Sequence, residues 1–167
     1  MKTLVLYDSM YGNTERIAKA MTKALEEFGP ANALRVDHAQ LNDMGGVGLL
    51  MIGCPTQAWQ LTPATRTFIK LILDDVPAQF AVACFDTRLN KPKWLTGSAA
   101  DGIAKQVKKI HVAQILPPES FLVASKEGPL VQGELERAVA WARDLARSMA
   151  QVTDEKHAQT NPIGQAS

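Results

Sequence analysis

The chain has 167 residues, which is enough for one buried core and too few for two ordinary domains. Apolar residues make up 46% of the chain and charged residues 21%, a composition that excludes a disordered chain. The 18 basic and 17 acidic residues give a net charge of +1. They form no basic stripe of the kind that would indicate nucleic-acid binding. No apolar run reaches the roughly 18 residues of a membrane helix, and the first run is too short for a signal peptide, so we expect a cytoplasmic protein.

Short apolar runs bounded by turn residues predict the β-strands. Runs that are apolar at nearly every position predict a sheet covered on both faces. Pro117 and Pro118 cannot donate to a sheet ladder, so the last strand should be interrupted or lie at an edge. The predicted strands are residues 3–7, 47–52 and 80–85, a broken pair at 112–116 and 121–124, and a weaker candidate at 33–36.

Segments with helical spacing separate these runs. Ile17, Met21 and Leu25 would share the buried face of a first helix. Thr62 and Ser98 predict the N-caps of two further helices, and a last helix is expected from Leu135 to Met149.

Strands and helices therefore alternate, which predicts an α/β fold: a three-layer, doubly wound sandwich with helices on both faces of a parallel sheet. Because helical spacing stops after residue 149, we expect one domain at residues 1–150 and a polar, disordered tail at residues 151–167. Ligands of such folds bind beyond the carboxyl ends of the strands.

The loop after the first predicted strand has the composition of a phosphate cradle. Gly12 and the polar side chains of Ser9, Asn13 and Thr14 would let N–H and O–H donors converge on an anion at a helix N-terminus. The loop lacks a Walker lysine and the three glycines of a dinucleotide fingerprint, so a phosphomonoester is expected. The alternative is that these side chains only cap the helix.

Other chemistry-bearing residues indicate no separate site. Cys54 and Cys84 lie at the ends of apolar runs without metal-ligand spacing, and we interpret them as core residues. The three histidines are scattered, and no Ser/His/Asp arrangement is present, so neither a metal site nor a catalytic side chain is expected.

Two loops resemble those of the flavodoxin family. Residues 7–15 (YDSMYGNTE) resemble its phosphate loop, and residues 53–59 (GCPTQAW) resemble the flavin-flanking loop after its third strand. Residues 86–97 fall where flavodoxins place their other flavin-flanking segment. The similarity in layout extends to about residue 150 and implies a five-stranded parallel sheet of order 2-1-3-4-5 and bound flavin mononucleotide (FMN).

The resemblance also implies which residues bind FMN. The first loop would hold the phosphate, Thr56 and Gln57 would line the polar edge of the ring, and Trp59 would stack on it. Arg88 would lie beside the pyrimidine edge and raise the redox potential, or else be a solvated loop arginine. The predicted cofactor-binding residues are Ser9, Met10, Tyr11, Gly12, Asn13, Thr14, Pro55, Thr56, Gln57, Ala58, Trp59, Asp86, Thr87, Arg88, Trp94 and Gly97.

Two departures from the family pattern bear on function. Family members that shuttle electrons are usually strongly acidic, whereas this chain is nearly neutral. A glycine is usual in the second loop, and Ala58 in its place should resist a positive φ. An electron carrier, an FMN-dependent NAD(P)H:quinone reductase and a flavin-free interaction module therefore remain alternatives, the first being preferred. The expected partner is a redox protein or a small quinone, and the chain would be a monomer or a homodimer.

A loop at residues 126–130 offers a further partner surface, although an ordinary edge connection is the simpler interpretation.

Overall fold

The structure is a computed structural model that describes residues 1–72, 80–110, 112 and 114–160, with only the backbone described at 72, 114–115 and 152–160. The strands are β1 (Lys2–Tyr7), β2 (Ala31–Arg35), β3 (Val47–Pro55), β4 (Ala81–Leu89), β5 (Gln114–Ile115) and β6 (Glu119–Val123). The α-helices are α1 (Asn13–Leu25), α2 (Pro63–Ile72), α3 (Lys93–Thr96), α4 (Ala99–Val107) and α5 (Glu134–Thr160), and short 3-10 helices cover Glu26–Phe28 and Leu41–Met44.

All strand pairs are parallel, and the sheet order is β2-β1-β3-β4-β5, which confirms the predicted order. The fifth position holds two short strands, because β5 pairs with Ala81 and Val82 while β6 pairs with the segment Phe85–Leu89 of the same strand β4. Pro117 and Pro118 lie between β5 and β6. The expected interruption of the last strand is therefore confirmed.

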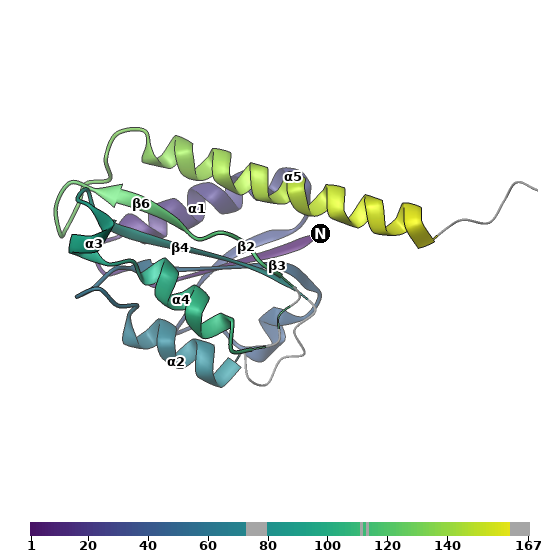
Figure 1. Cartoon of the computed structure of the whole chain (residues 1–167), viewed down its shortest axis with the longest axis horizontal. Coiled ribbons are helices and arrows are strands. Elements are labelled where there is room, and N and C mark those ends of the chain that lie inside the picture. The colour runs from purple at the N-terminus through teal and green to yellow at the C-terminus, as the bar shows by residue number, and fades with distance from the viewer. Residues whose placement is uncertain (73–79, 111, 113, 161–167) are drawn as a thin grey trace, which may run out of the picture.

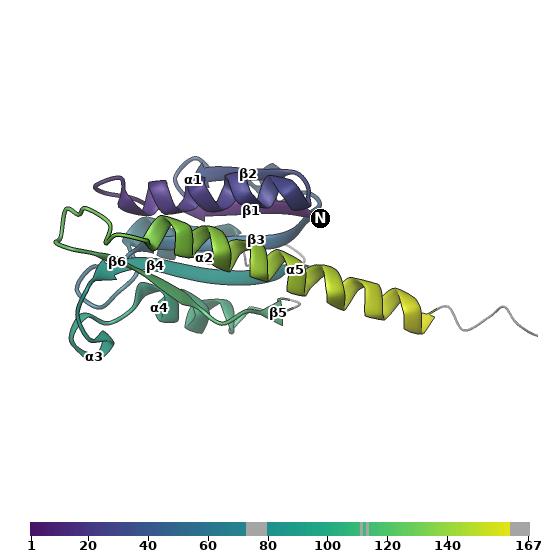
Figure 2. The same ribbon diagram turned by 90° about the horizontal axis from the view of Figure 1, so that it is seen from above.

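The helices form the two outer layers of a sandwich (Figures 1 and 2): α1 and α5 cover one face of the sheet, and α2 and α4 cover the other. The side chains of alternate β1 residues point to opposite faces of the sheet. Leu4 and Leu6 pack with the α2 and α4 side, whereas Val5 and Tyr7 pack with α1 and α5. This alternation explains why the central strands are apolar at nearly every position, since both of their faces are buried.

The predicted helix starts are confirmed by their capping contacts. The Thr62 hydroxyl accepts a hydrogen bond from the Thr65 N–H at 3.4 Å, and the Ser98 hydroxyl accepts one from the Asp101 N–H at 3.2 Å. No helix in the described part of the chain is long and apolar enough to cross a membrane.

The end of the last helix differs from the prediction. We expected it near Met149, but α5 continues to Thr160 and extends past the end of the sheet (Figure 1). Residues 151–160 contain no glycine or proline, so nothing in them ends a helix even though the apolar spacing stops. The rest of the predicted tail, residues 161–167, lies outside the described residues, and a domain boundary at residue 150 stays a prediction.

Cys54 and Cys84 are fully buried in β3 and β4, which confirms that they are core residues. Burial raises the pKa of Cys54 to about 11 and that of Cys84 to about 12, so both remain neutral thiols at physiological pH.

Two side chains of α5 form hydrogen bonds with backbone groups at the free edge of β6. The Glu134 carboxylate accepts a hydrogen bond from the Leu122 N–H at 2.6 Å, and the Arg137 guanidinium donates to the Ser120 carbonyl. Glu134 and Arg137 are also an ion pair. These contacts occupy backbone groups that would otherwise be open to pairing with another strand.

We expect Glu134→Gln to change the pH dependence of stability. Burial raises the pKa of Glu134, but hydrogen bonds from Arg137 and from the Leu122 N–H outweigh it, so the pKa lies below its ordinary value. A lowered folded-state pKa means that the ionised group stabilises the fold above its unfolded pKa of about 4.3 and loses this effect as the pH falls. Denaturant unfolding at about pH 7 should show the variant roughly 1–3 kcal/mol less stable. This difference in the free energy of unfolding should disappear below about pH 4. An unchanged difference at about pH 3 would contradict a stabilising role of the ionised Glu134 carboxylate.

Candidate functional site

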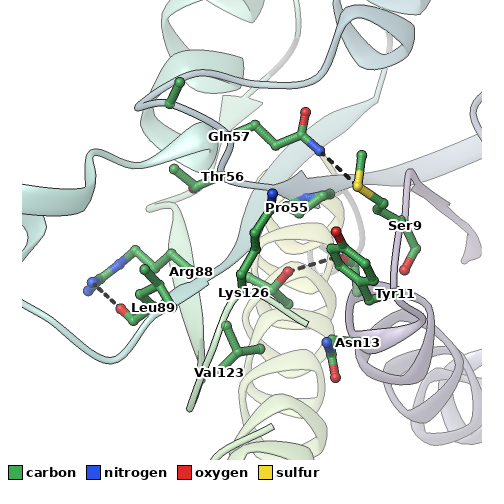
Figure 3. Close-up of a pocket in the computed structure, with 14 residues that line it drawn as sticks. Ser9, Tyr11, Asn13, Pro55, Thr56, Gln57, Arg88, Leu89, Val123 and Lys126 are labelled. Atoms are coloured by element: carbon green, nitrogen blue, oxygen red, sulfur yellow. Dashed lines mark hydrogen bonds between the residues drawn. The ribbon is translucent and has the colours of Figure 1, made fainter. Parts of the chain in front are cut away.

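The loops at the carboxyl ends of β1, β3, β4 and β6 enclose a cavity of about 460 Å³. This volume falls within the range of small-ligand pockets, roughly 300–1,000 Å³. The cavity lies where a doubly wound sheet is expected to bind ligands. Its lining residues are Ser9, Met10, Tyr11, Asn13, Thr14, Pro55, Thr56, Gln57, Ala58, Thr87, Arg88, Leu89, Val123 and Lys126 (Figure 3).

The first loop brings the N-terminus of α1 to this cavity. Gly12 is the N-cap residue and has a φ of +82°, a left-handed conformation that favours glycine. No described side chain makes a capping hydrogen bond to this helix. The alternative role of Ser9, Asn13 and Thr14 as helix caps is therefore wrong. The first-turn N–H groups remain available to an anion, whose charge the helix dipole would stabilise.

The polar side chains of this loop instead brace it against its neighbours. The Asn13 side-chain amide donates to the Glu127 carbonyl at 3.0 Å, which ties the loop to the segment after β6. The hydroxyls of Thr14 and Thr87 lie 2.7 Å apart and share a buried hydrogen bond between α1 and β4. The predicted phosphate cradle thus has backbone donors on a loop that these side-chain hydrogen bonds hold in place.

The second loop makes a tight two-residue hairpin. The backbone groups of Gln57 and Gln60 exchange hydrogen bonds of 3.0 and 2.8 Å, and the central residues Ala58 and Trp59 have φ values of +45° and +64°. Positive φ at both central positions is typical of a type I′ turn. The expectation that Ala58 would resist a positive φ is wrong, because the hairpin hydrogen bonds hold it there.

Thr56 and Asp86 connect this loop to α4. The Asp86 carboxylate is fully buried, and its Oδ2 accepts hydrogen bonds from the Thr56 hydroxyl, the Ser98 hydroxyl and the Ala100 N–H. The Thr56 hydroxyl also accepts from the Ala99 N–H at 2.8 Å. Asp86 does not line the cavity; it lies at the N-terminus of α4, where the helix dipole stabilises a carboxylate.

Trp59, predicted to stack on the flavin, and Trp94, also predicted to bind the cofactor, both lie outside the cavity lining. Trp59 is 62% exposed, and its indole N–H donates to the Leu95 carbonyl at 2.9 Å. Gly97 has a φ of +70°, and a Cβ there would come within 2.6 Å of Trp59. Trp94 is 82% exposed on α3. Stacking of Trp59 on a flavin and contact of Trp94 with it stay predictions.

Arg88 lines the cavity with part of its side chain, while its guanidinium turns toward the segment after β4 (Figure 3). Its Nη1 donates to the carbonyls of Lys91 at 2.8 Å and Leu89 at 3.4 Å. Its Nε is buried and has no hydrogen-bond partner among the described residues. The guanidinium therefore braces this loop, and its proximity to a bound ring stays a prediction.

Three cavity residues were not predicted: Leu89, Val123 and Lys126. Val123 and Lys126 belong to β6 and the loop after it, and the Lys126 side chain extends into the cavity (Figure 3). The sequence signal that could have identified Val123 and Lys126 was their position at the carboxyl end of the last predicted strand. The loop after that strand, however, carries no recognisable binding motif.

The residues present fit FMN. An uncapped helix N-terminus suits the phosphate, and the side chains of Pro55, Leu89 and Val123 supply apolar wall for a flat ring. Tyr11, 44% exposed, presents an aromatic ring from the phosphate loop itself.

Comparisons with solved structures agree with this fold. A flavodoxin from the domain Archaea matches with a TM-score of 0.72 at 16% identity, over 90% of this chain and 99% of that one. A flavodoxin from Pseudomonas aeruginosa matches with a TM-score of 0.71 at 20% identity, over 90% of this chain and 99% of that one. The rubredoxin oxygen:oxidoreductase of Desulfovibrio gigas matches with a TM-score of 0.72 at 16% identity, over 90% of this chain but only 36% of that one.

A search of curated protein sequences finds no match. The family model described as flavodoxin matches residues 5–88, which is half of the chain and includes the first two cavity loops and β4 up to Arg88. The chain therefore belongs to the flavodoxin family, whose members are FMN-binding electron-transfer flavoproteins.

Proposed function

We propose that this chain binds FMN in the cavity and transfers electrons between redox partners. The observation that carries the proposal is the N-terminus of α1, which opens on the cavity with no capping side chain among the described residues. The first-turn N–H groups after Gly12 would hold the phosphate. FMN would supply the redox chemistry, since no protein side chain is required to carry the electron.

The chain's own residues position and shield the cofactor. Asn13 and Thr14 fix the phosphate loop through Glu127 and Thr87. Pro55, Leu89 and Val123 keep water from the part of the cavity that they line. Lys126 adds a cation, which would favour an anionic ligand.

Flavin retention tests the cofactor. The purified protein is mixed with excess FMN, passed through a desalting column and examined for visible absorbance and quenched flavin fluorescence. We expect FMN to remain bound in about equimolar amount. A colourless protein would contradict the site and favour the flavin-free interaction module.

Steady-state turnover separates a carrier from a reductase. The FMN-loaded protein is incubated with NADPH and a benzoquinone, and NADPH oxidation is followed. We expect negligible turnover without a second flavoprotein to supply electrons. Sustained turnover by the protein alone would support the quinone reductase instead.

A cytoplasmic location also stays a prediction.

A further inference from the structure

Two side chains that line the cavity, Met10 and Gln57, meet and join its first two loops. Met10 lies in the loop after β1, and Gln57 lies in the loop after β3. The side-chain amide of Gln57 donates a hydrogen bond to the Met10 sulfur at 3.8 Å, drawn in Figure 3 as the dashed line that ends on the sulfur atom. A thioether sulfur is a weak acceptor, so this contact is weak in the unmodified protein. We call it the Met10–Gln57 clasp.

The Met10 sulfur is open to oxidants. Met10 is 60% exposed, the largest exposed fraction among the six methionines of the chain. The two thiols do not compete for the oxidant, because Cys54 and Cys84 are fully buried and neutral. Oxidation of sulfur side chains follows exposure and, for cysteine, thiolate character. A peroxide should therefore oxidise Met10 first, and this side chain lines the proposed cofactor cavity.

Oxidation would turn the weak acceptor of the clasp into a strong one. The sulfur lone pair attacks one oxygen of hydrogen peroxide, the S–O bond forms, the O–O bond breaks, and the other oxygen leaves as water. Sulfur loses two electrons and the peroxide gains them, which gives methionine sulfoxide. The sulfoxide oxygen carries a partial negative charge and lies one bond length beyond the sulfur. It can therefore meet the Gln57 amide at the distance of an ordinary N–H···O hydrogen bond, roughly 2.7–3.2 Å.

We propose that Met10 is a reversible oxidation site, at which sulfoxide formation strengthens the Met10–Gln57 clasp and slows the release of FMN from the cavity. This rests on the proposed function, because the clasp governs release only if the cavity holds FMN. The oxidant is a peroxide, a product that the oxygen chemistry of flavins can supply. Methionine sulfoxide reductases reverse the modification, so the clasp would return to its weak form.

Peptide mapping tests the site of oxidation. The protein, with and without FMN, is treated with limiting hydrogen peroxide, and each methionine is quantified by mass spectrometry. We expect Met10 to be oxidised at least as fast as Met1, which is 44% exposed at the opposite end of β1. Met21 and Met51 are fully buried and should stay reduced. If FMN-free Met10 reacted no faster than Met51, the proposed oxidation site would be wrong.

NMR of the FMN-free protein tests the clasp. The side-chain amide signals of Gln57 are assigned in ¹⁵N-labelled protein by their loss in Gln57→Leu, and they are followed during peroxide treatment. We expect an amide proton of Gln57 to move downfield, because its hydrogen bond to an oxygen is stronger than that to a sulfur. Met10→Leu keeps the exposed Met1 and controls for oxidation elsewhere; its Gln57 signals should not move.

The rate of FMN release tests the consequence. FMN-loaded protein, before and after peroxide treatment, is diluted, and the recovery of flavin fluorescence is followed. We expect release to be roughly fivefold slower after treatment, the factor that corresponds to one ordinary hydrogen bond. Treatment should not change the release rate of Met10→Leu, nor that of Gln57→Leu, in which Met10 is oxidised but has no amide donor. Methionine sulfoxide reductase should restore the original rate of the unmodified sequence.

Three results would overturn the proposal. Faster release after oxidation would show that the polar sulfoxide disturbs the cavity. An unmoved Gln57 signal would show that the sulfoxide does not bond the amide. Equal slowing in treated Met10→Leu would assign the effect to another residue. A failure of the proposed function would appear separately, as absence of FMN from the untreated protein, whereas the mapping and NMR results do not depend on FMN.

Discussion

Gly53→Ala should lower the free energy of unfolding by about 3 kcal/mol, at the upper end of the usual cost of overpacking a core. Gly53 lies in β3 opposite Phe85 in β4. An added Cβ would come within 2.2 Å of two atoms of the Phe85 ring. That ring cannot move away freely, because it is fully buried and packs edge-on against Phe121 with centroids 6.3 Å apart. Denaturant unfolding measures the loss.

Two further variants separate this clash from a general effect of replacing glycine in a strand. Gly48→Ala, also in β3, would bring its Cβ to 2.7 Å from Cγ of the flexible Met1 side chain, and we expect a much smaller loss. Phe85→Leu in the Gly53→Ala background should recover part of the stability, because it removes the ring atoms that clash. Equal losses for both glycine variants, or no recovery, would show that the ring does not enforce glycine here.

Asn13→Asp should weaken FMN binding by roughly 30- to 100-fold, because it places a negative charge at the site proposed for the phosphate. Asn13 is 9% exposed, lines the cavity and is the first residue of α1. The substitution conserves size, but it also removes the amide that donates to the Glu127 carbonyl. Fluorescence titration with FMN at about pH 7.5 gives the dissociation constant.

Riboflavin distinguishes charge repulsion from disturbed folding, because it has the same ring and no phosphate. Its affinity should change far less than that of FMN in the Asn13→Asp variant. Asn32→Asp, at an exposed position of β2, makes the same charge change and should leave both affinities as they are. If Asn13→Asp weakened FMN and riboflavin equally, the phosphate would not be held at the N-terminus of α1.

Much of the fold was predictable because its signals are local. Both faces of the sheet are covered, so the central strands are apolar at nearly every position and were found from composition alone. Thr62 and Ser98 mark helix starts because their hydroxyls bond N–H groups only three residues ahead. The end of α5 was missed because helical backbone continues wherever nothing breaks it, even after the apolar spacing stops.

The composition of the proposed phosphate loop was also visible in the sequence, because its residues are contiguous and the proposed binding depends on backbone N–H groups at a helix N-terminus. The roles of its side chains were not. Asn13 and Thr14 bond to Glu127 and Thr87, which are more than 70 residues away along the chain. Only the pairing of β4 with β6 and the packing of α1 bring these partners together.

By itself the sequence determined the doubly wound class, the positions of the main strands and helices, and the composition of the loop proposed to hold an anion, since these follow from local periodicity and short-range hydrogen bonds. Tertiary structure decided three further features: the place of Lys126 in the cavity, the burial of Asp86 away from it, and the joining of Trp59 to Leu95 on an exposed surface. Each depends on how loops from separate strands meet at one edge of the sheet, and residue spacing along the chain does not encode that meeting.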